Sequence, residues 1–393
     1  MGLINRTVSD WLSGIPPERA VLLLGARGTG RETLLRGILP RRTLWFSETI
    51  GENVRSLQSL EEADFQVLQA QADALVLQEA QCVPDLFQLL ERLSGFNLGL
   101  ERPIRIYAIS STDLLAEAKA AAAGVETVRL WPISAEELAD ATSGGWDEMT
   151  RSLSLHLIFG MLPEVLTDPV NAAAYLANYA ESKLLRDLYS STSIRIREKL
   201  GTLIRFLAMN VGHELSYDRI AGSVGINRVT AMDYIAEMEN SFILKICPSF
   251  SSRLDGERKK GKKIYFIDNG IRNAVLKDFT PFSGRKDQKV LWENFFFMER
   301  IKHHSYLHRE EKIYYWRLTG RKARSIDFVE LTDSGMQAFQ CRVSNRERIS
   351  SQEEFKAAYP ECRIDLIQPS DLRLSFMQYP SQVWLGDPEE SKT

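Results

Sequence analysis

The sequence predicts an α/β fold in which a parallel sheet with a phosphate-binding loop is followed by a helical connector, a winged helix and a second, mixed α/β domain. Three observations predict it. Apolar segments alternate with helical segments over residues 1–140, a glycine-rich segment follows the first apolar segment directly, and a helix–turn–helix pattern with a hairpin occupies residues 201–275. At roughly 100–200 residues per domain, the 393 residues suffice for two to four domains.

Composition and charge exclude several classes of protein. Hydrophobic residues make up 44% and charged residues 26% of the chain, which excludes a largely disordered protein. The net charge of −3 argues against coating nucleic acid through bulk charge, but it permits a local basic patch. No apolar run reaches about 18 residues, so no membrane span is predicted. The start lacks the apolar core of a signal peptide and the 4 cysteines are widely spaced, which favours the cytoplasm.

Short apolar segments in residues 1–140 have the pattern of buried strands. Helical segments such as Leu86–Leu93 separate them, and this alternation predicts a parallel sheet with helices on both faces. A helix is predicted to begin after Ser134, which has capping-box spacing to Glu137. The predicted strands are Ala20–Gly25, Arg42–Phe46, Ala74–Leu77, Ile104–Ile109 and Val125–Trp131.

The remaining residues change character twice. Residues 141–200 are predicted to form a helical connector that breaks at Gly160–Pro163. In residues 201–275, Asn227 is the predicted N-cap of a helix over Arg228–Glu239, and a hairpin ends in Lys262–Ile267, which is the order of a winged helix. Residues 276–393 return to a mixed α/β pattern. The predicted strands there are Ile313–Trp316, Ser325–Leu331 and Met336–Val343.

The segment Gly25–Thr33 reads G-A-R-G-T-G-R-E-T and lies between a predicted strand and a predicted helix, as a phosphate-binding loop must. Glycines let backbone N–H groups wrap phosphates, and the helix N-terminus adds partial positive charge, so the loop is a candidate site for ATP. Against the full motif G-x-x-x-x-G-K-[ST], Arg31 stands at the lysine position and Glu32 at the Ser/Thr position. The predicted nucleotide-binding residues are Gly25, Gly28, Gly30, Arg31, Glu32, Thr33 and Gln78.

Two substitutions weaken the predicted Mg²⁺ site. Glu32 replaces the hydroxyl that would hold the metal by a carboxylate near the phosphates, where like charges about 4 Å apart repel by about 4 kcal/mol at an intermediate dielectric. A carboxylate can also ligate Mg²⁺ directly, so metal binding stays open. After the strand Ala74–Leu77, Gln78 replaces the Asp expected to orient the water shell of the metal. Glu79 remains, and it is the predicted catalytic residue of an active site because it could polarise an attacking water.

An ordered series of short motifs runs along most of the chain. Its members are Gly25–Thr33, Leu77–Pro84, Ala108–Ser111, Pro132–Glu137, Gly160–Glu164, Arg186–Asp187, Ile264–Gly270, Trp292–Phe295, Tyr315–Arg317 and Ser325–Val329. The series resembles that of bacterial and archaeal AAA-type P-loop ATPases with a C-terminal domain of unknown function, which contains a winged helix and a restriction-endonuclease-like fold. The resemblance implies an AAA-type domain over residues 1–140, a connector over 141–200, a winged helix over 201–275 and an endonuclease-like domain over 276–393.

The chain departs from the family pattern outside the loop as well. Val125 stands where the family places a trans-acting arginine. In the endonuclease-like domain the resemblance implies a metal site with one carboxylate from Asp327 and a Glu-x-Lys on the next strand, to which Glu293 could add a third carboxylate. The Glu-x-Lys position reads Gln340-Cys341-Arg342, in which the neutral amide is a poor ligand and the always-protonated arginine cannot act as a base. Asp327 is therefore interpreted as a vestigial catalytic residue, and no metal is predicted.

Charges separate within the predicted winged helix. The helix over residues 228–240 has a net charge of −2, which is unfavourable beside closely spaced phosphates. The hairpin that follows, residues 253–263, carries six basic and two acidic residues and could track a DNA backbone without sequence specificity. His303 and His304 are predicted to form a surface pair and not a metal site. The predicted nucleic-acid contacts are Arg258, Lys259, Lys260, Lys262 and Lys263.

Two functions follow from these patterns. In the first, both sites are eroded and the chain is a non-catalytic or weakly ATP-binding subunit for assembly or DNA docking, with a protein partner or a second copy of itself. In the alternative, it is an active AAA ATPase that remodels a nucleic-acid or protein partner. Drift at one place alone would be unsurprising, so the parallel losses at three places favour the first function. These are Glu32 with Gln78, Val125, and Gln340 with Arg342.

Overall fold

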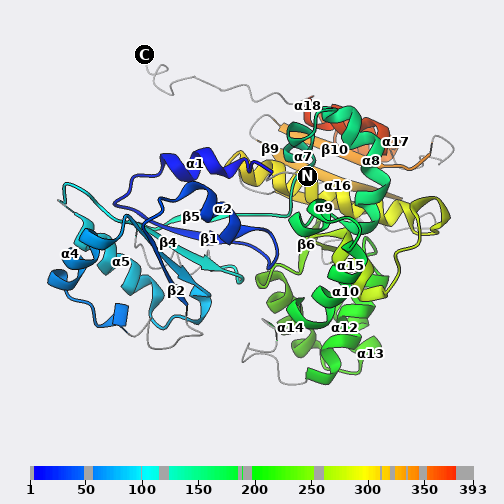
Figure 1. Cartoon of the computed structure of the whole chain (residues 1–393). Coiled ribbons are helices and arrows are strands. Elements are labelled where there is room, and N and C mark those ends of the chain that lie inside the picture. Colours follow the sequence, from blue (N-terminus) through cyan, green and yellow to red (C-terminus); the bar gives the residue numbers. More distant parts are fainter. Residues whose placement is uncertain are drawn as a thin grey trace, which may run out of the picture.

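The computed structural model of the chain contains two sheets, each packed against helices (Figure 1). The N-terminal third of the chain builds the first sheet, and the C-terminal half builds the second. Within the part of the chain that the structure describes, no helix is long and apolar enough to cross a membrane. The described residues are 4–47, 56–98, 100–114, 124–184, 188, 197–251, 261–309, 312–318, 324–332, 335–344 and 352–377.

The strands of the first sheet are all parallel, in the order β2-β3-β4-β1-β5, which confirms the predicted parallel sheet and the α/β class. Side chains of β1 alternate between two cores: Leu22 and Leu24 pack with residues of α4 and α5, and Leu23 with residues of α1 and α2. Because both of its faces are buried, β1 has a continuous apolar sequence. The elements are α1 (Val8–Gly14), β1 (Ala20–Leu24), α2 (Arg31–Ile38), β2 (Thr43–Ser47), α4 (Glu62–Gln71), β3 (Ala74–Gln78), η1 (Ala80–Cys82), α5 (Leu86–Asn97), β4 (Arg105–Ser110) and β5 (Glu126–Arg129).

Helices dominate residues 135–240, and their predicted starts are confirmed. The Ser134 hydroxyl accepts the N–H of Glu137, whose carboxylate accepts the N–H of Ser134 in return, so the predicted capping box is present. Asn227 caps α14 by accepting the N–H of Thr230. The elements are α7 (Ala135–Ala141), α8 (Gly145–Phe159), α9 (Pro163–Thr167), α10 (Ala172–Asn178), the π-helix η2 (Tyr179–Lys183), α12 (Arg197–Met209), α13 (Tyr217–Val224) and α14 (Arg228–Asn240).

The second sheet includes the predicted hairpin. Strands β6 and β7 are antiparallel, but β6 also pairs in parallel with β8, where Ser249 lies opposite Tyr315. The hairpin therefore forms one edge of a six-stranded sheet with the order β11-β10-β9-β8-β6-β7, and this sheet crosses the predicted domain boundary at residue 275. The strands are β6 (Leu244–Phe250), β7 (Lys262–Phe266), β8 (Ile313–Leu318), β9 (Arg324–Thr332), β10 (Gly335–Cys341) and β11 (Arg363–Ile367), of which β11 was not predicted.

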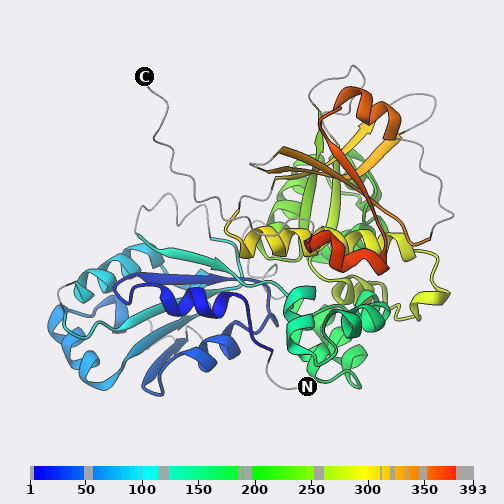
Figure 2. The ribbon, with the colours of Figure 1, turned by 90° about the horizontal axis from the view of Figure 1, so that it is seen from above.

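Helix α16 (Gln288–Tyr306) lies between the second sheet and the connector helices (Figure 2), and its residues 291–304 are buried. The prediction that His303 and His304 form a surface pair is wrong. Nδ1 of His303 lies 3.3 Å from a carboxylate oxygen of Glu136, and Nε2 of His304 lies 3.0 Å from one of Glu330. The remaining elements are α15 (Asn269–Leu276), η3 (Phe282–Gly284), α17 (Gln352–Ala358), η4 (Pro369–Asp371) and α18 (Leu372–Met377).

Candidate functional site

The phosphate-binding loop leaves β1 and enters α2 at the carboxyl edge of the first sheet. Gly28 and Gly30 have φ of 79° and 86°, a left-handed conformation that disfavours residues with a Cβ atom. Thr29 is fully buried, and its hydroxyl donates to the carbonyl of Ala26 at 2.9 Å, which holds the turn. The loop therefore presents the first turn of α2, whose N–H groups have no partners within the helix, at the place where a phosphate would bind.

The side chains at the two substituted positions contact other parts of the protein. The Arg31 guanidinium donates to the carbonyl of Ser110 at the end of β4. Glu32 is exposed and accepts from Arg36 at 2.6 Å, one turn further along α2. Thr33 is also exposed, and Gln78 is half-buried at the end of β3. The predicted nucleotide-binding residues thus lie along one edge of the sheet, but Glu32 pairs with a side chain of its own helix.

Glu79 is held by two side chains. Its two carboxylate oxygens accept from the two terminal nitrogens of Arg27, each at 2.7 Å, and the Gln81 amide donates to Oε2 at 2.7 Å. The same Gln81 amide donates to Ser111 at 3.0 Å. Burial raises the pKa of Glu79, but the hydrogen bonds and charge of Arg27 outweigh it and leave this pKa below its usual range. The only predicted catalytic residue beside the loop is therefore a fixed, ionised partner of the loop arginine.

The connector covers the loop. The Tyr179 hydroxyl donates to the carbonyl of Arg27 at 2.9 Å. A Cβ atom added to Gly28 would lie 2.8 Å from the Tyr175 hydroxyl and 3.3 Å from the Tyr179 ring, so both tyrosines touch the loop at its glycine. Burial, with the charges of Glu164 and Asp268, raises the pKa of Tyr175 to about 12. This tyrosine therefore stays neutral, and it adds no negative charge beside a bound phosphate.

Arg6 is a residue of this region that the sequence did not reveal. Its buried guanidinium donates to the carbonyls of Thr29 at 2.8 Å and Trp131 at 2.7 Å, and to Glu137 at 3.1 Å. It also lies 3.2 Å from the hydroxyl of Tyr306, the last residue of α16. These partners are distant in sequence, so no local pattern could have predicted them. Arg6 links the phosphate-binding loop to the helix that supports the second sheet.

Residues implied for an endonuclease site do come together, but with an added lysine. Glu293 of α16 accepts from Lys263 at 2.8 Å and from the Tyr265 hydroxyl at 2.5 Å through the same oxygen. Asp327 of β9 lies 3.9 Å from the Lys263 nitrogen and accepts the N–H of Cys341 at 2.9 Å. Burial and the Glu293 charge raise the pKa of Asp327 to about 6, against the lowering effect of the Lys263 charge.

The donor set does not fit a divalent metal. No group of three or more His, Cys, Asp or Glu side chains with metal-binding geometry occurs among the described residues. Gln340 and Arg342, at the Glu-x-Lys position, each have a buried side-chain atom without a hydrogen-bond partner in the described structure, Oε1 and Nε respectively. A single neutral amide oxygen beside an ion-paired lysine is a poor substitute for a carboxylate ligand. We therefore derive no metal-dependent step at this site.

The structure describes only two of the five basic residues predicted to contact nucleic acid, Lys262 and Lys263. Residues Arg258, Lys259 and Lys260 lie outside the described residues. The Lys262 ammonium lies 3.2 Å from the centre of the Tyr217 ring. Lys263 is only 7% exposed and faces carboxylates, so the prediction that it contacts a DNA backbone conflicts with its burial.

The structure describes only some of the other positions that the resemblance singled out. Val125, at the position of the family's arginine, is half-buried and packs against the main core. Arg186 and Asp187 lie outside the described residues.

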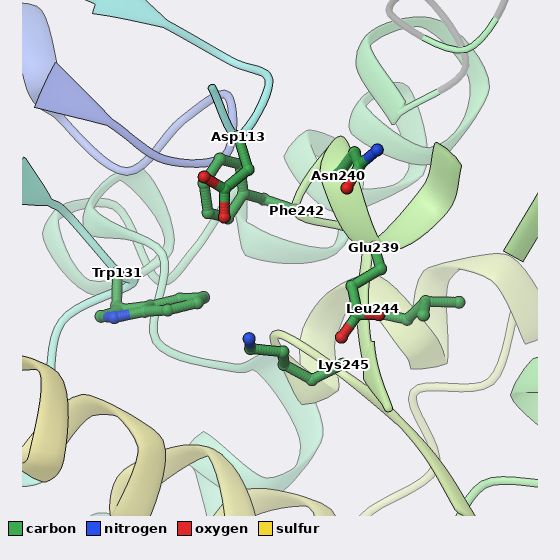
Figure 3. Close-up of a pocket in the computed structure, with 7 residues that line it drawn as sticks. All are labelled: Asp113, Trp131, Glu239, Asn240, Phe242, Leu244 and Lys245. Atoms are coloured by element: carbon green, nitrogen blue, oxygen red, sulfur yellow. The ribbon is translucent and has the colours of Figure 1, made fainter. Parts of the chain in front are cut away.

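A cavity of about 140 Å³ separates the first sheet from α14 and β6 (Figure 3). Its polar wall includes Asp113, whose N–H donates to the carbonyl of Asn240 at 2.7 Å and whose carboxylate pairs with Arg129 at 2.7 Å. The hydrogen bond from Asp113 to Asn240 joins the segment after β4 to the end of α14, and no predicted site residue lines the cavity. Its lining residues are Asp113, Trp131, Glu239, Asn240, Phe242, Leu244 and Lys245.

Two protein-family models match parts of the chain. A domain of unknown function (DUF8612) matches residues 150–281, and a second domain of unknown function (DUF4143) matches residues 289–381. The second match agrees with the C-terminal domain of unknown function that the resemblance implies. Uncharacterised proteins of Mycobacterium tuberculosis and Mycobacterium bovis are 26% identical over 324 residues, which are 79% of this chain and 68% of theirs. An uncharacterised protein of Haemophilus influenzae is 25% identical over 177 residues, 42% of this chain and 44% of its own.

Solved structures similar to this chain include P-loop ATPases. The Walker-type ATPase PABY2304 of Pyrococcus abyssi has a TM-score of 0.47 and 12% identity, with 70% of this chain and 96% of that chain covered. DnaA of Aquifex aeolicus with bound AMPPCP has a TM-score of 0.27 and 16% identity, with coverages of 61% and 89%. RuvB of Thermotoga maritima has a TM-score of 0.27 and 13% identity, with coverages of 58% and 81%. The P-loop interpretation of this chain rests on the geometry of the loop described above.

Proposed function

We propose that this chain is a P-loop protein that binds ATP weakly or not at all, does not hydrolyse it, and serves as an assembly or DNA-docking subunit. The observation that carries this proposal is the bidentate ion pair between Arg27 and Glu79. A general base must reach the proton that it removes, and it works best with a pKa near the working pH. Glu79 instead has both oxygens occupied and a lowered pKa. The missing hydroxyl at Glu32 and the missing carboxylate at Gln78 support the same conclusion.

The first test is ATP binding and turnover by the purified chain, with and without Mg²⁺. We expect phosphate release at the background rate, and the same rate in Glu79→Gln, because the carboxylate takes no part in chemistry. We also expect weak or undetectable binding at millimolar ATP. Tyr107→Phe is the control for expression and purification, because it retains a buried aromatic ring in β4 and changes no residue of the loop.

An active ATPase remains the second candidate, and the retained Glu79 beside the loop favours it. Turnover by the natural chain that disappears in Glu79→Gln would establish this second candidate and reject the first. Turnover that persists in Glu79→Gln would point to a contaminating ATPase, and separation of that activity from the chain by further purification would decide the matter.

The order of elements supports a winged helix as the docking unit. Helices α12, α13 and α14 precede the β6–β7 hairpin, and Leu215 pairs with Lys262 in an isolated antiparallel bridge beside it. The acidic α14 is a poor candidate for the major groove, because its charge opposes that of the phosphates. We therefore assign DNA contact to the hairpin, through Lys262 and the neighbouring Arg258, Lys259 and Lys260.

The second test is the salt dependence of binding to duplex DNA. Replacing Arg258, Lys259 and Lys260 by Gln is expected to weaken binding equally for all sequences and to flatten the plot of log affinity against log salt. Each lost phosphate contact should reduce the slope by about 0.9. The charge-matched control replaces three exposed basic residues elsewhere, and it should leave the slope unchanged. These are Arg102, Arg151 and Lys277. Equal slopes in both triple variants would reject the hairpin as the docking site.

A further inference from the structure

The endonuclease-like site contains a cation of its own. The Lys263 ammonium enters from β7 and lies 2.8 Å from an oxygen of Glu293 and 3.9 Å from one of Asp327. All three side chains are at most 9% exposed. They come from β7, α16 and β9, so the fold itself brings them together.

We propose that the Lys263 ammonium permanently takes the place of a divalent cation between Glu293 and Asp327, so that this site excludes metal and serves as a structural ion-pair centre. A divalent ion needs carboxylate oxygens at about 2.0–2.6 Å. Lys263 already occupies one Glu293 oxygen together with the Tyr265 hydroxyl, and the N–H of Cys341 occupies one Asp327 oxygen.

Charge balance supports the same inference. Glu293 and Asp327 contribute two negative charges, and Lys263 neutralises one of them within the site. Lys289 approaches the second oxygen of Asp327 at 4.0 Å from a more exposed position. Lys263 and Lys289 therefore already neutralise the two carboxylates, and a divalent cation entering the site would meet an ammonium a few ångströms away.

Gln340 is the nearby residue whose side chain could favour metal binding. Its buried Oε1 has no hydrogen-bond partner in the described structure, and it lies on β10 next to the strand of Asp327. An amide oxygen is neutral, so it would not offset the repulsion between the Lys263 ammonium and a metal ion. A water molecule would satisfy it as well as a metal would.

The inference leads to a gain of metal binding when the ammonium is removed. Lys263→Met keeps most of the apolar stem of the side chain but leaves two carboxylates without their partner. We expect the natural chain to show no change in its melting temperature with millimolar Mn²⁺ or Mg²⁺. Lys263→Met should melt at a lower temperature than the natural chain without metal, and recover several degrees with Mn²⁺. The triple variant Lys263→Met, Glu293→Gln, Asp327→Asn should not respond to metal.

A direct binding measurement keeps the proposal testable should Lys263→Met fail to fold. Manganese binding to the natural chain and to Asp327→Asn is compared by electron paramagnetic resonance. Equal binding by both proteins is expected, because only surface sites elsewhere would contribute. One additional stoichiometric Mn²⁺ on the natural chain, lost in Asp327→Asn, would overturn the proposal, as would a Lys263→Met variant that folds and gains no response to Mn²⁺. The ATP and DNA tests above do not depend on either result.

Discussion

Replacing Arg300 by Met is expected to destabilise the chain by about 3–5 kcal/mol, because it leaves a buried carboxylate without its cation. Arg300 of α16 and Glu330 of β9 form two hydrogen bonds of 2.7 Å, and their side chains are 3% and 1% exposed. Burial would raise the pKa of Glu330, but the charge and hydrogen bonds of Arg300, with a contribution from His304, lower it to about 2. The carboxylate is therefore charged in the folded chain, and Arg300 is its main partner, with His304 as the second.

Urea unfolding at neutral pH measures the loss. The double variant Arg300→Met, Glu330→Leu should regain most of the lost free energy of unfolding, since a buried ion pair can often be exchanged for apolar side chains of similar volume. Arg102→Met, which breaks the exposed pair with Asp73 at 3.2 Å, is the matched control and should cost at most about 1 kcal/mol. Losses of equal size in Arg300→Met and Arg102→Met would contradict the expectation.

Replacing Gly160 by Ala is expected to have an effect at least as large. The added Cβ atom would lie 1.9 Å from a carboxylate oxygen of Asp268, and Gly160 has a φ of 76°. Asp268 cannot easily move away, because its carboxylate accepts the N–H of Met161 at 2.6 Å and caps α15 through the N–H of Ile271 at 3.2 Å. We expect a loss of more than about 4 kcal/mol, or no folded protein.

Gly201→Ala is expected to stabilise the same protein, in contrast to Gly160→Ala. Gly201 lies inside α12, and a Cβ atom there would meet no heavy atom within 4 Å. Alanine restricts the unfolded chain and favours a helix, so we expect a gain of about 0.5–1 kcal/mol. Thermal unfolding followed by circular dichroism compares the two variants. A small loss in Gly160→Ala, comparable to the change in Gly201→Ala, would show that the α8–α15 contact is looser than described.

Local signals predicted much of the fold. The five apolar strands of the first sheet, the capping box at Ser134 and the N-cap at Asn227 all lie where the sequence placed them, because each depends on neighbouring residues only. The burial of His303 and His304 was missed, since the polar end of a helix gives no sign of the elements that pack on it. The pairing of β6 with β8 was missed for a similar reason, as it joins segments about 65 residues apart.

The sequence predicted which residues make up the candidate sites, but not which of them contact one another. The sequence indicated that Glu32, Gln78, Gln340 and Arg342 weaken their sites, and this required only comparison with a motif. It could not indicate that Arg27 holds Glu79 or that Lys263 lies between two carboxylates, because these partners meet only after strands far apart in sequence have paired. The role expected for Lys263 followed from its basic neighbours in sequence, whereas its environment follows from the pleat of β7, which turns alternate side chains inward.

The pairing of β6 with both β7 and β8 has a mechanical consequence. A β-hairpin attached only by its own turn could swivel, and it would transmit little force to the body of the protein. Here hydrogen-bond ladders join β6 to the whole C-terminal sheet, and the helix α16 that packs on this sheet ends at Tyr306, whose hydroxyl lies beside Arg6. Such an anchorage favours movement of the hairpin, the C-terminal sheet and α16 as one unit.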